Sequence, residues 1–145
     1  MGQINTSVEL PATPERVFEL AGDPNHFEKW LTLHVKFKDD LPQQLSTGAR
    51  FTEVISMMGM PNTITWTVDE FQPPKTLKIS GTGMAGVRIS ITIAVERAGE
   101  GSKLDLTTEF EGQMIVGALG KAIEKQGQAE LDKSIEQFSS LLAAA

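Results

Sequence analysis

The longest regular pattern in the chain is an amphipathic helix from about residue 114 to the C-terminus. Apolar positions recur there at intervals of four or three residues, which places them on one face of an α-helix. Gly120 and Gly127 lie on or beside this stripe, where each costs roughly 1 kcal/mol relative to alanine. We interpret them as leaving open space beneath the helix. The stripe consists of Leu119, Ile123, Gly127, Leu131, Ile135, Phe138 and Leu142.

Apolar and polar residues alternate with a period of two along most of the preceding chain, which predicts β-strands. Two short helices interrupt the alternation after the first strand. Thr13-Pro14 and Asp23-Pro24 each combine a capping side chain with a proline, and both residue types favour the start of a helix. The expected strands cover residues 3–11, 33–37, 51–57, 64–68, 77–79, 87–95 and 104–110.

These elements predict an α+β fold in which a curved antiparallel sheet of about seven strands wraps around the long C-terminal helix. A helix that is not pressed tightly against such a sheet leaves an internal cavity, so we expect a ligand-binding protein. A chain of this length buries roughly 68–70% of its unfolded surface, which is enough for a core with a pocket. The sequence shows no repeat or linker, and we expect one domain over residues 1–145.

Composition excludes several classes of function. The net charge of −6 argues against nucleic-acid binding, which requires a basic surface. Cysteine is absent, so disulfides, thiol nucleophiles and thiolate metal sites are excluded. No apolar run approaches the roughly 18 residues of a membrane span, and the N-terminus lacks the pattern of a signal peptide. We therefore expect a cytoplasmic protein without a membrane span, either a monomer or a homodimer.

The order of the elements and several short motifs resemble one known superfamily. Pro14-Glu15-Arg16-Val17-Phe18, followed by Asp23-Pro24 and Trp30, is similar to the opening of bacterial members of the START-like helix-grip (SRPBCC) superfamily. That superfamily contains polyketide cyclases and aromatases, plant pathogenesis-related and birch-pollen-type proteins, and lipid-transfer domains. The resemblance covers essentially the whole chain and implies the helix-grip fold. Because one fold hosts many functions, it does not by itself define the activity.

Four further strings are similar to an actinobacterial subgroup of that superfamily. One mycobacterial member of the subgroup is described as the toxin of a type II toxin–antitoxin pair. This resemblance implies an antitoxin protein partner as an alternative to a small-molecule ligand. The strings are Trp30-Leu31-Thr32-Leu33-His34, Gly59-Met60-Pro61-Asn62, Ile64-Thr65-Trp66-Thr67 and Pro73-Pro74.

Glu53 is the candidate catalytic residue. It falls between Phe51 and Ile55, so strict alternation directs its carboxylate to the apolar face of the sheet. Burial penalises an ionised carboxylate unless it finds a cation or several donors, and this is how general acids and bases are made. Alternation assigns no cation to the same face. Thr108 is the other polar side chain expected inside, so the chemistry available for polyketide cyclisation is sparse.

Two imidazoles and a carboxylate are in principle sufficient to bind a metal. His34, however, shares its strand phase with Thr32, Lys36 and Lys38, the more polar face, and we expect it to be exposed or hydrogen-bonded. His26 lies in the first turn of a short helix. We therefore predict neither a metal site nor a cofactor.

Residues 81–86 formally match the dinucleotide-binding pattern G-x-G-x-x-G. That fingerprint must open a helix whose N-terminus binds the pyrophosphate. Here it precedes Val87-Arg88-Ile89-Ser90-Ile91, which alternates as a strand. We interpret the motif as a glycine-rich hairpin at the rim of the cavity.

Aromatic and methionine side chains are suited to the wall of a pocket for apolar ligands, since methionine adapts its shape. The group Met57-Met58-Gly59-Met60-Pro61 indicates a flexible lid or a surface that contacts a partner. The expected ligand-binding residues are Trp30, Phe51, Ile55, Trp66, Met84, Ile91, Thr108, Phe110, Leu119, Ile123 and Gly127.

Three functions remain open at this point. The first is binding of a small hydrophobic or amphipathic ligand, such as a lipid, a fatty acid or a polyketide-like compound. The second is a cyclase or dehydratase that uses Glu53 as its acid–base group. The third is a toxin-like component that acts through contact with another protein. Convergence of Glu53, Thr108 and a basic side chain on one cavity would favour the enzyme.

Overall fold

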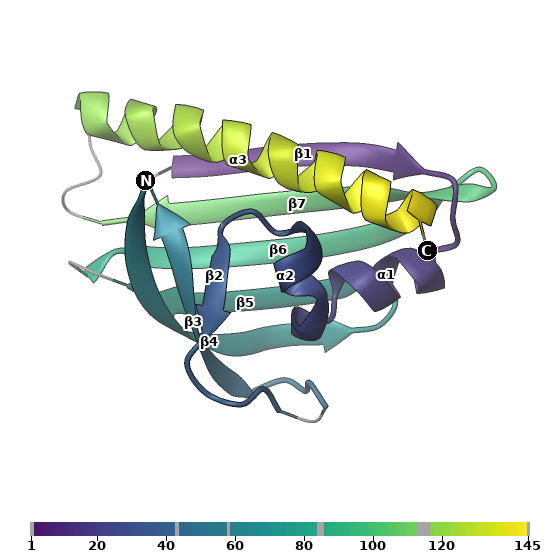
Figure 1. Cartoon of the computed structure of the whole chain (residues 1–145), viewed down its shortest axis with the longest axis horizontal. Helices are drawn as coiled ribbons and strands as arrows, with labels where there is room; N and C mark the ends of the chain where they lie inside the picture. The colour runs from purple at the N-terminus through teal and green to yellow at the C-terminus, as the bar shows by residue number, and fades with distance from the viewer. Residues whose placement is uncertain (1, 43, 58, 84–85, 113–116, 145) are drawn as a thin grey trace.

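The computed structural model describes residues 2–42, 44–57, 59–83, 86–112 and 117–144. Within these ranges, seven antiparallel strands form one curved sheet in the order β1-β7-β6-β5-β4-β3-β2, and a long helix lies across it (Figure 1). The elements are β1 Gly2–Leu10, α1 Pro14–Ala21, η1 Pro24–His26, α2 Phe27–Trp30, β2 His34–Phe37, β3 Arg50–Met57, β4 Met60–Gln72, β5 Thr76–Thr82, β6 Arg88–Ala98, β7 Gly101–Glu111 and α3 Gly117–Ala144.

The architecture confirms the α+β helix-grip fold expected from the sequence. Each predicted strand is present, with β2 shorter and β4 considerably longer than the alternation indicated. The expected start of the C-terminal helix at residue 114 lies outside the described residues, and the described helix begins at Gly117. The first and last strands of the chain, β1 and β7, pair along their whole length, which brings the two halves of the sequence together.

The two predicted helix starts are capped as expected. The hydroxyl of Thr13 accepts a hydrogen bond from the backbone N–H of Arg16 at 3.3 Å, and α1 ends at Gly22. The carboxylate of Asp23 accepts from the backbone N–H of Asn25 at 2.9 Å, which begins η1. These caps satisfy N–H groups that the first helical turn leaves without partners. They fix α1 and α2 as a short layer beside the second half of α3 (Figure 1).

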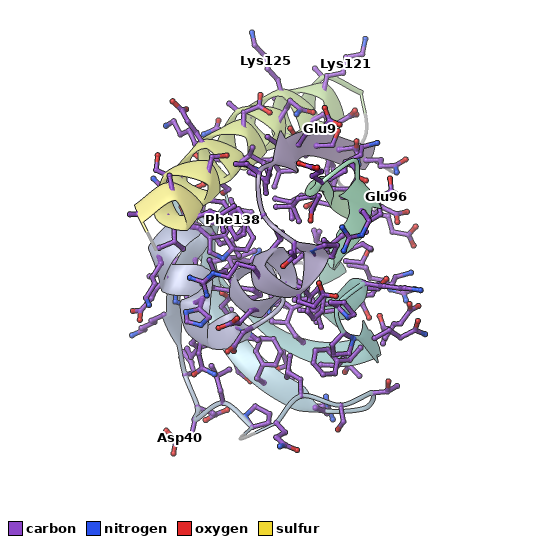
Figure 2. All side chains as sticks on the ribbon, turned by 90° about the vertical axis from the view of Figure 1, so that its right-hand side faces the viewer. Glu9, Asp40, Glu96, Lys121, Lys125 and Phe138 are labelled. Carbon is purple, nitrogen blue, oxygen red and sulfur yellow. The ribbon has the colours of Figure 1, made fainter. Side chains whose placement is uncertain are left out.

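Helix α3 is buried unevenly along its length. In its second half, Leu131, Ile135 and Phe138 are buried, and Phe138 points into the molecule while Lys121 and Lys125 project from the outer face (Figure 2). In its first half, Leu119 is 45% exposed and Ile123 is only partly buried. The second half of α3 therefore anchors the helix on the core, and the first half buries fewer side chains.

Among the described residues, no helix has the length and the apolar character of a membrane span.

Candidate functional site

The first half of α3 and the inner face of the sheet line a partly open cavity of about 70 Å³. Most of its walls are aliphatic or aromatic, and polar side chains are few. One end of the cavity is bounded by Gly59, in the turn between β3 and β4. The lining residues are Ile4, Leu33, Ile55, Ser56, Gly59, Ile89, Ile91, Thr108, Phe110, Ile123, Gln126, Gly127, Glu130 and Leu131.

Strand register explains why the floor of the cavity is apolar. Thr108 of β7 lies opposite Ile4 of β1 on one side and Ile91 of β6 on the other. Side chains that are directly opposite in adjacent strands point to the same face of the sheet. The row Ile4–Thr108–Ile91 therefore crosses three strands with a single hydroxyl at its centre. The neighbouring pair of Phe110 and Ile89 continues the same surface.

The Thr108 hydroxyl has no hydrogen-bond partner among the described residues, although the residue is only 8% exposed. Buried polar groups are nearly always paired in folded proteins, and an unpaired one costs roughly 1–3 kcal/mol. The Oγ1 atom of Thr108 is therefore an unused hydrogen-bonding group in the wall of an apolar cavity.

Gly127 lies on α3 directly above Ile4 of β1. A Cβ atom built at Gly127 would overlap the Cδ1 methyl group of Ile4, and both residues line the cavity. The absence of a side chain at this position thus allows α3 to approach β1 closely. Our interpretation that this glycine only leaves open space was incomplete, because it serves close packing at one edge of the cavity as well.

A cluster of polar groups connects α3 to the segment between α2 and β2. The hydroxyl of Ser134 accepts a hydrogen bond from the backbone N–H of Thr32 at 2.9 Å. The hydroxyl of Thr32 lies 2.7 Å from Oε2 of Glu130 and donates to it. We call Thr32, Glu130 and Ser134 the α3 clasp. Because Leu33 and Glu130 both line the cavity, the clasp holds together two parts of its wall.

Glu53 is fully buried, as the alternation of β3 predicted, but it is not unpaired. Nε1–H of Trp66 donates to Oε1 of Glu53 at 2.8 Å, and Nδ1 of His34 is hydrogen-bonded to Oε2. When Glu53 is ionised, its oxygens only accept hydrogen bonds, and Nδ1 of His34 is then the donor. Both oxygens of Glu53 are thus occupied by side chains of the chain itself. Glu53 is not among the residues that line the cavity.

The assignment of His34 to the polar face was wrong, and a β-bulge is the reason. The side chain of His34 is only 6% exposed, whereas Val35 is 51% exposed. The register of β2 against β3 shifts between His34 and Lys36, and such an irregularity re-aims side chains. His34 and Phe37 consequently both face inward, with ring centroids 4.6 Å apart. In a regular strand, two residues separated by three positions would point to opposite faces. This shift supplies the inward basic group that the sequence pattern did not assign to Glu53.

The structure brings six of the expected ligand-binding residues together around the cavity and places the others elsewhere. Trp30 packs edge-on against Phe27 and Phe138 in the core. Trp66 and Phe51 are buried around Glu53 and Phe37. Leu119 is exposed at the start of α3, and Met84, like Met58 of the methionine group, lies outside the described residues. The six that line the cavity are Ile55, Ile91, Thr108, Phe110, Ile123 and Gly127.

Several lining residues were missed by the sequence analysis. Ile4 and Ile89 had a usable signal, because they share the inward phase of strands that were predicted correctly. Gln126 and Glu130 had none, since they lie beside the apolar stripe of α3 and resemble surface residues. Only the position of the helix over the sheet makes them part of the cavity.

The structure also bears on two sites that were considered from the sequence, a metal site at the histidines and the dinucleotide-binding pattern at residues 81–86. Among the described residues, no group of three or more His, Cys, Asp or Glu side chains is arranged to bind a metal ion. Gly81 and Thr82 belong to β5, and β6 begins at Arg88, so the glycine motif connects two strands. The backbone N–H of Gly83 donates to the carbonyl of Val87 at 2.8 Å, as in a hairpin. In the described residues around it, the motif leads into a strand and not into the long helix whose N-terminus binds a pyrophosphate.

Comparisons with known proteins agree with this architecture. An uncharacterized protein of Mycobacterium tuberculosis, Rv1546, is 30% identical over 141 residues, covering 97% of this chain and 99% of its own. Toxin Rv0910 of the same organism is 27% identical over 143 residues, covering 99% of each chain. The crystal structure of TTHA0849 from Thermus thermophilus superposes with a TM-score of 0.75 at 20% identity, covering 99% of this chain and 98% of its own.

The family described as "Polyketide cyclase / dehydrase and lipid transport" matches residues 1–143, which is nearly the whole chain. The shared fold with TTHA0849 confirms the helix-grip arrangement that the resemblance of the opening motifs implied. The match of the family over nearly the whole chain leads to one classification. This chain belongs to the polyketide cyclase/dehydrase and lipid transport family of the START-like helix-grip superfamily.

Proposed function

We propose that this protein binds a small apolar or amphipathic molecule, such as a lipid, a fatty acid or a polyketide-like compound, between α3 and the sheet. The observation that carries the proposal is the partly open cavity itself, whose walls are mostly aliphatic and aromatic. Sites of this composition favour apolar ligands, since burial contributes roughly 25 cal/mol for each Å² of apolar surface removed from water. The match to a family that includes lipid transport supports the same class of ligand.

The size of the cavity limits what it holds without rearrangement. At roughly 10–15 Å³ for each water molecule, the cavity of about 70 Å³ accommodates about five to seven waters. That space suits a short aliphatic chain or a small ring. A longer ligand requires the first half of α3 to move outward, and this is the part of the helix with the fewest buried side chains. We propose that the first half of α3 is the movable wall.

A catalytic role for Glu53 receives less support from the geometry. General acid–base catalysis requires the group to lie within hydrogen-bond reach of the substrate. Glu53 is engaged by Trp66 and His34 and does not line the cavity, whereas Thr108 does. The convergence of Glu53, Thr108 and a basic side chain that would favour a cyclase is thus incomplete. Assays of cyclisation or dehydration with the wild type and Glu53→Gln would test the enzymatic alternative.

A toxin-like role through protein contact is the second candidate. It is supported by the similarity to Toxin Rv0910 and by large apolar side chains that are exposed at Val35, Met60 and Leu119. We expect such a partner to be a small antitoxin encoded beside this gene. Co-expression of the neighbouring open reading frame with the tagged chain would test it. Failure of that product to co-purify and to relieve growth inhibition would contradict the toxin-like role.

Titration with an environment-sensitive apolar dye tests the proposed function. We expect saturable fluorescence enhancement that medium-chain fatty alcohols reverse by displacing the dye. A cavity-free protein of similar size and charge provides the control for non-specific adsorption. A dye signal no greater than that of the control, together with no displacement, would contradict the proposal.

A further inference from the structure

We infer that the cavity selects neutral ligands that carry a ketone or hydroxyl oxygen within an otherwise apolar body, and that the Thr108 hydroxyl binds this oxygen. The inference deepens the proposed function and rests on it. It begins from Thr108, whose buried Oγ1 atom lines the cavity without a partner among the described residues. Because this hydroxyl is unpaired in an otherwise apolar wall, we expect the natural ligand to supply its hydrogen-bond partner.

Within the described part of the chain, the strands on either side of Thr108 offer its hydroxyl no partner. Its strand, β7, is paired on one side with β1 and on the other with β6, so the adjacent backbone groups serve the sheet. The side chains directly opposite are Ile4 and Ile91, which have no polar atoms. By contrast, Thr107 points to the outer face, where its hydroxyl accepts from Nδ2 of Asn5 at 2.7 Å. Of these two neighbouring threonines, only the one that faces the cavity has a hydroxyl without a partner among the described residues.

The charge of the lining determines the kind of oxygen that fits. No Lys, Arg or His is found among the described residues that line the cavity, and Glu130 is the one ionisable side chain in that set. A carboxylate placed beside Thr108 would be desolvated without a cation, which is strongly unfavourable. A ketone or alcohol oxygen needs only one neutral hydrogen bond. Since a hydroxyl both donates and accepts, Thr108 pairs with either group.

The test compares ligands of equal length that differ only in the oxygen. Octane, the positional octanones and the octanols compete with a bound apolar dye on wild-type protein, Thr108→Val and Thr108→Ser. We expect Thr108→Val to weaken binding of the best ketone or alcohol isomer by about 5–10-fold, the value of one neutral hydrogen bond. Binding of octane should stay within about 2-fold, because valine preserves the shape of threonine. Thr108→Ser keeps the hydroxyl and should retain the preference of the wild type.

Thr92→Val is the matched control, because Thr92 pairs with the outward-facing Thr107 on the opposite side of the sheet. It should leave the affinities for all the probes unchanged. If octane binds but Thr108→Val weakens it as much as the oxygenated isomers, the role of Thr108 is overturned and the proposed function stands. If the wild type binds none of the probes and no fatty acid, the proposed function fails and the inference fails with it.

Discussion

At the scale of single residues, the buried carboxylate of Glu53 is more informative as a structural element than as a catalyst. Glu53 lies in β3 and is hydrogen-bonded to His34 of β2 and to Trp66 of β4, so it joins three neighbouring strands. An isolated buried charge is strongly unfavourable, and two donors compensate for part of its lost hydration. His34 lies in a short edge strand, so its contact with Glu53 helps to hold that edge in place.

Glu53→Gln should therefore destabilise the fold, which reverses the outcome expected for an unpaired carboxylate. The glutamine carbonyl can still accept from Trp66, but its NH₂ group faces the Nδ1–H of His34. We expect a loss of about 1–3 kcal/mol in the free energy of unfolding. Urea denaturation measures it, with the exposed Glu28→Gln as the control. Equal or higher stability of Glu53→Gln would show that the carboxylate is not a stabilising acceptor.

Thr108→Val in the ligand-free protein should be neutral or stabilising by up to about 1 kcal/mol, because it removes a buried hydroxyl that has no partner among the described residues. Equilibrium unfolding in urea measures the difference from the wild type, and Thr92→Val supplies the same chemical change on the outer face. A loss of more than about 1 kcal/mol would mean that the hydroxyl is already satisfied, for example by a buried water.

At the scale of elements, the two halves of α3 differ in the number of side chains that they bury in the core. Leu131, Ile135 and Phe138 anchor the second half, and the α3 clasp ties it to Thr32. The first half covers the cavity through Ile123 and Gly127. We expect ligand entry to move the first half outward, since few of its side chains are buried, and this movement must break its contacts with β1, such as the hydrogen bond from Nε2 of Gln128 to the carbonyl of Asn5 at 3.3 Å.

Gly127→Leu should block the cavity. The new side chain projects toward Ile4, which must shift, so we expect overpacking to cost about 1–3 kcal/mol, partly offset by roughly 1 kcal/mol of helix propensity. Ligand affinity should fall at least 10-fold. Thermal melts and dye titration measure both effects, with Ala129→Leu on the exposed face of α3 as the control. Unchanged ligand affinity would show that the ligand does not occupy the space beneath Gly127.

Ser134→Ala tests the α3 clasp. It leaves the backbone N–H of Thr32 without its acceptor, so we expect a loss of about 1–2 kcal/mol in the free energy of unfolding. Ser140→Ala, at an exposed position of the same helix, should change stability by less than about 0.5 kcal/mol. The two variants are compared by urea denaturation. An equal effect of both would show that the clasp does not hold the helix.

At the scale of the whole molecule, the fold could be predicted because its determinants are local. Alternation gave the strands, and Thr13 and Asp23 gave the helix starts, since each depends only on adjacent residues. The site depends on pairing between distant segments. The bulge that turns His34 inward arises from the register of β2 on β3. Glu130 lines the cavity because of the position in which α3 lies across the sheet. No periodicity in the sequence encodes either relation.

The central claim is that a small apolar molecule occupies the space between the first half of α3 and the sheet. The most direct measurement is an NMR titration of isoleucine-methyl-labelled protein with 1-octanol, a neutral amphipathic ligand. We expect saturable shifts of the cavity methyl groups of Ile4, Ile91 and Ile123, while Ile64, which is buried but does not line the cavity, stays unchanged. No saturable shift, or an equal shift of Ile64, would contradict the claim.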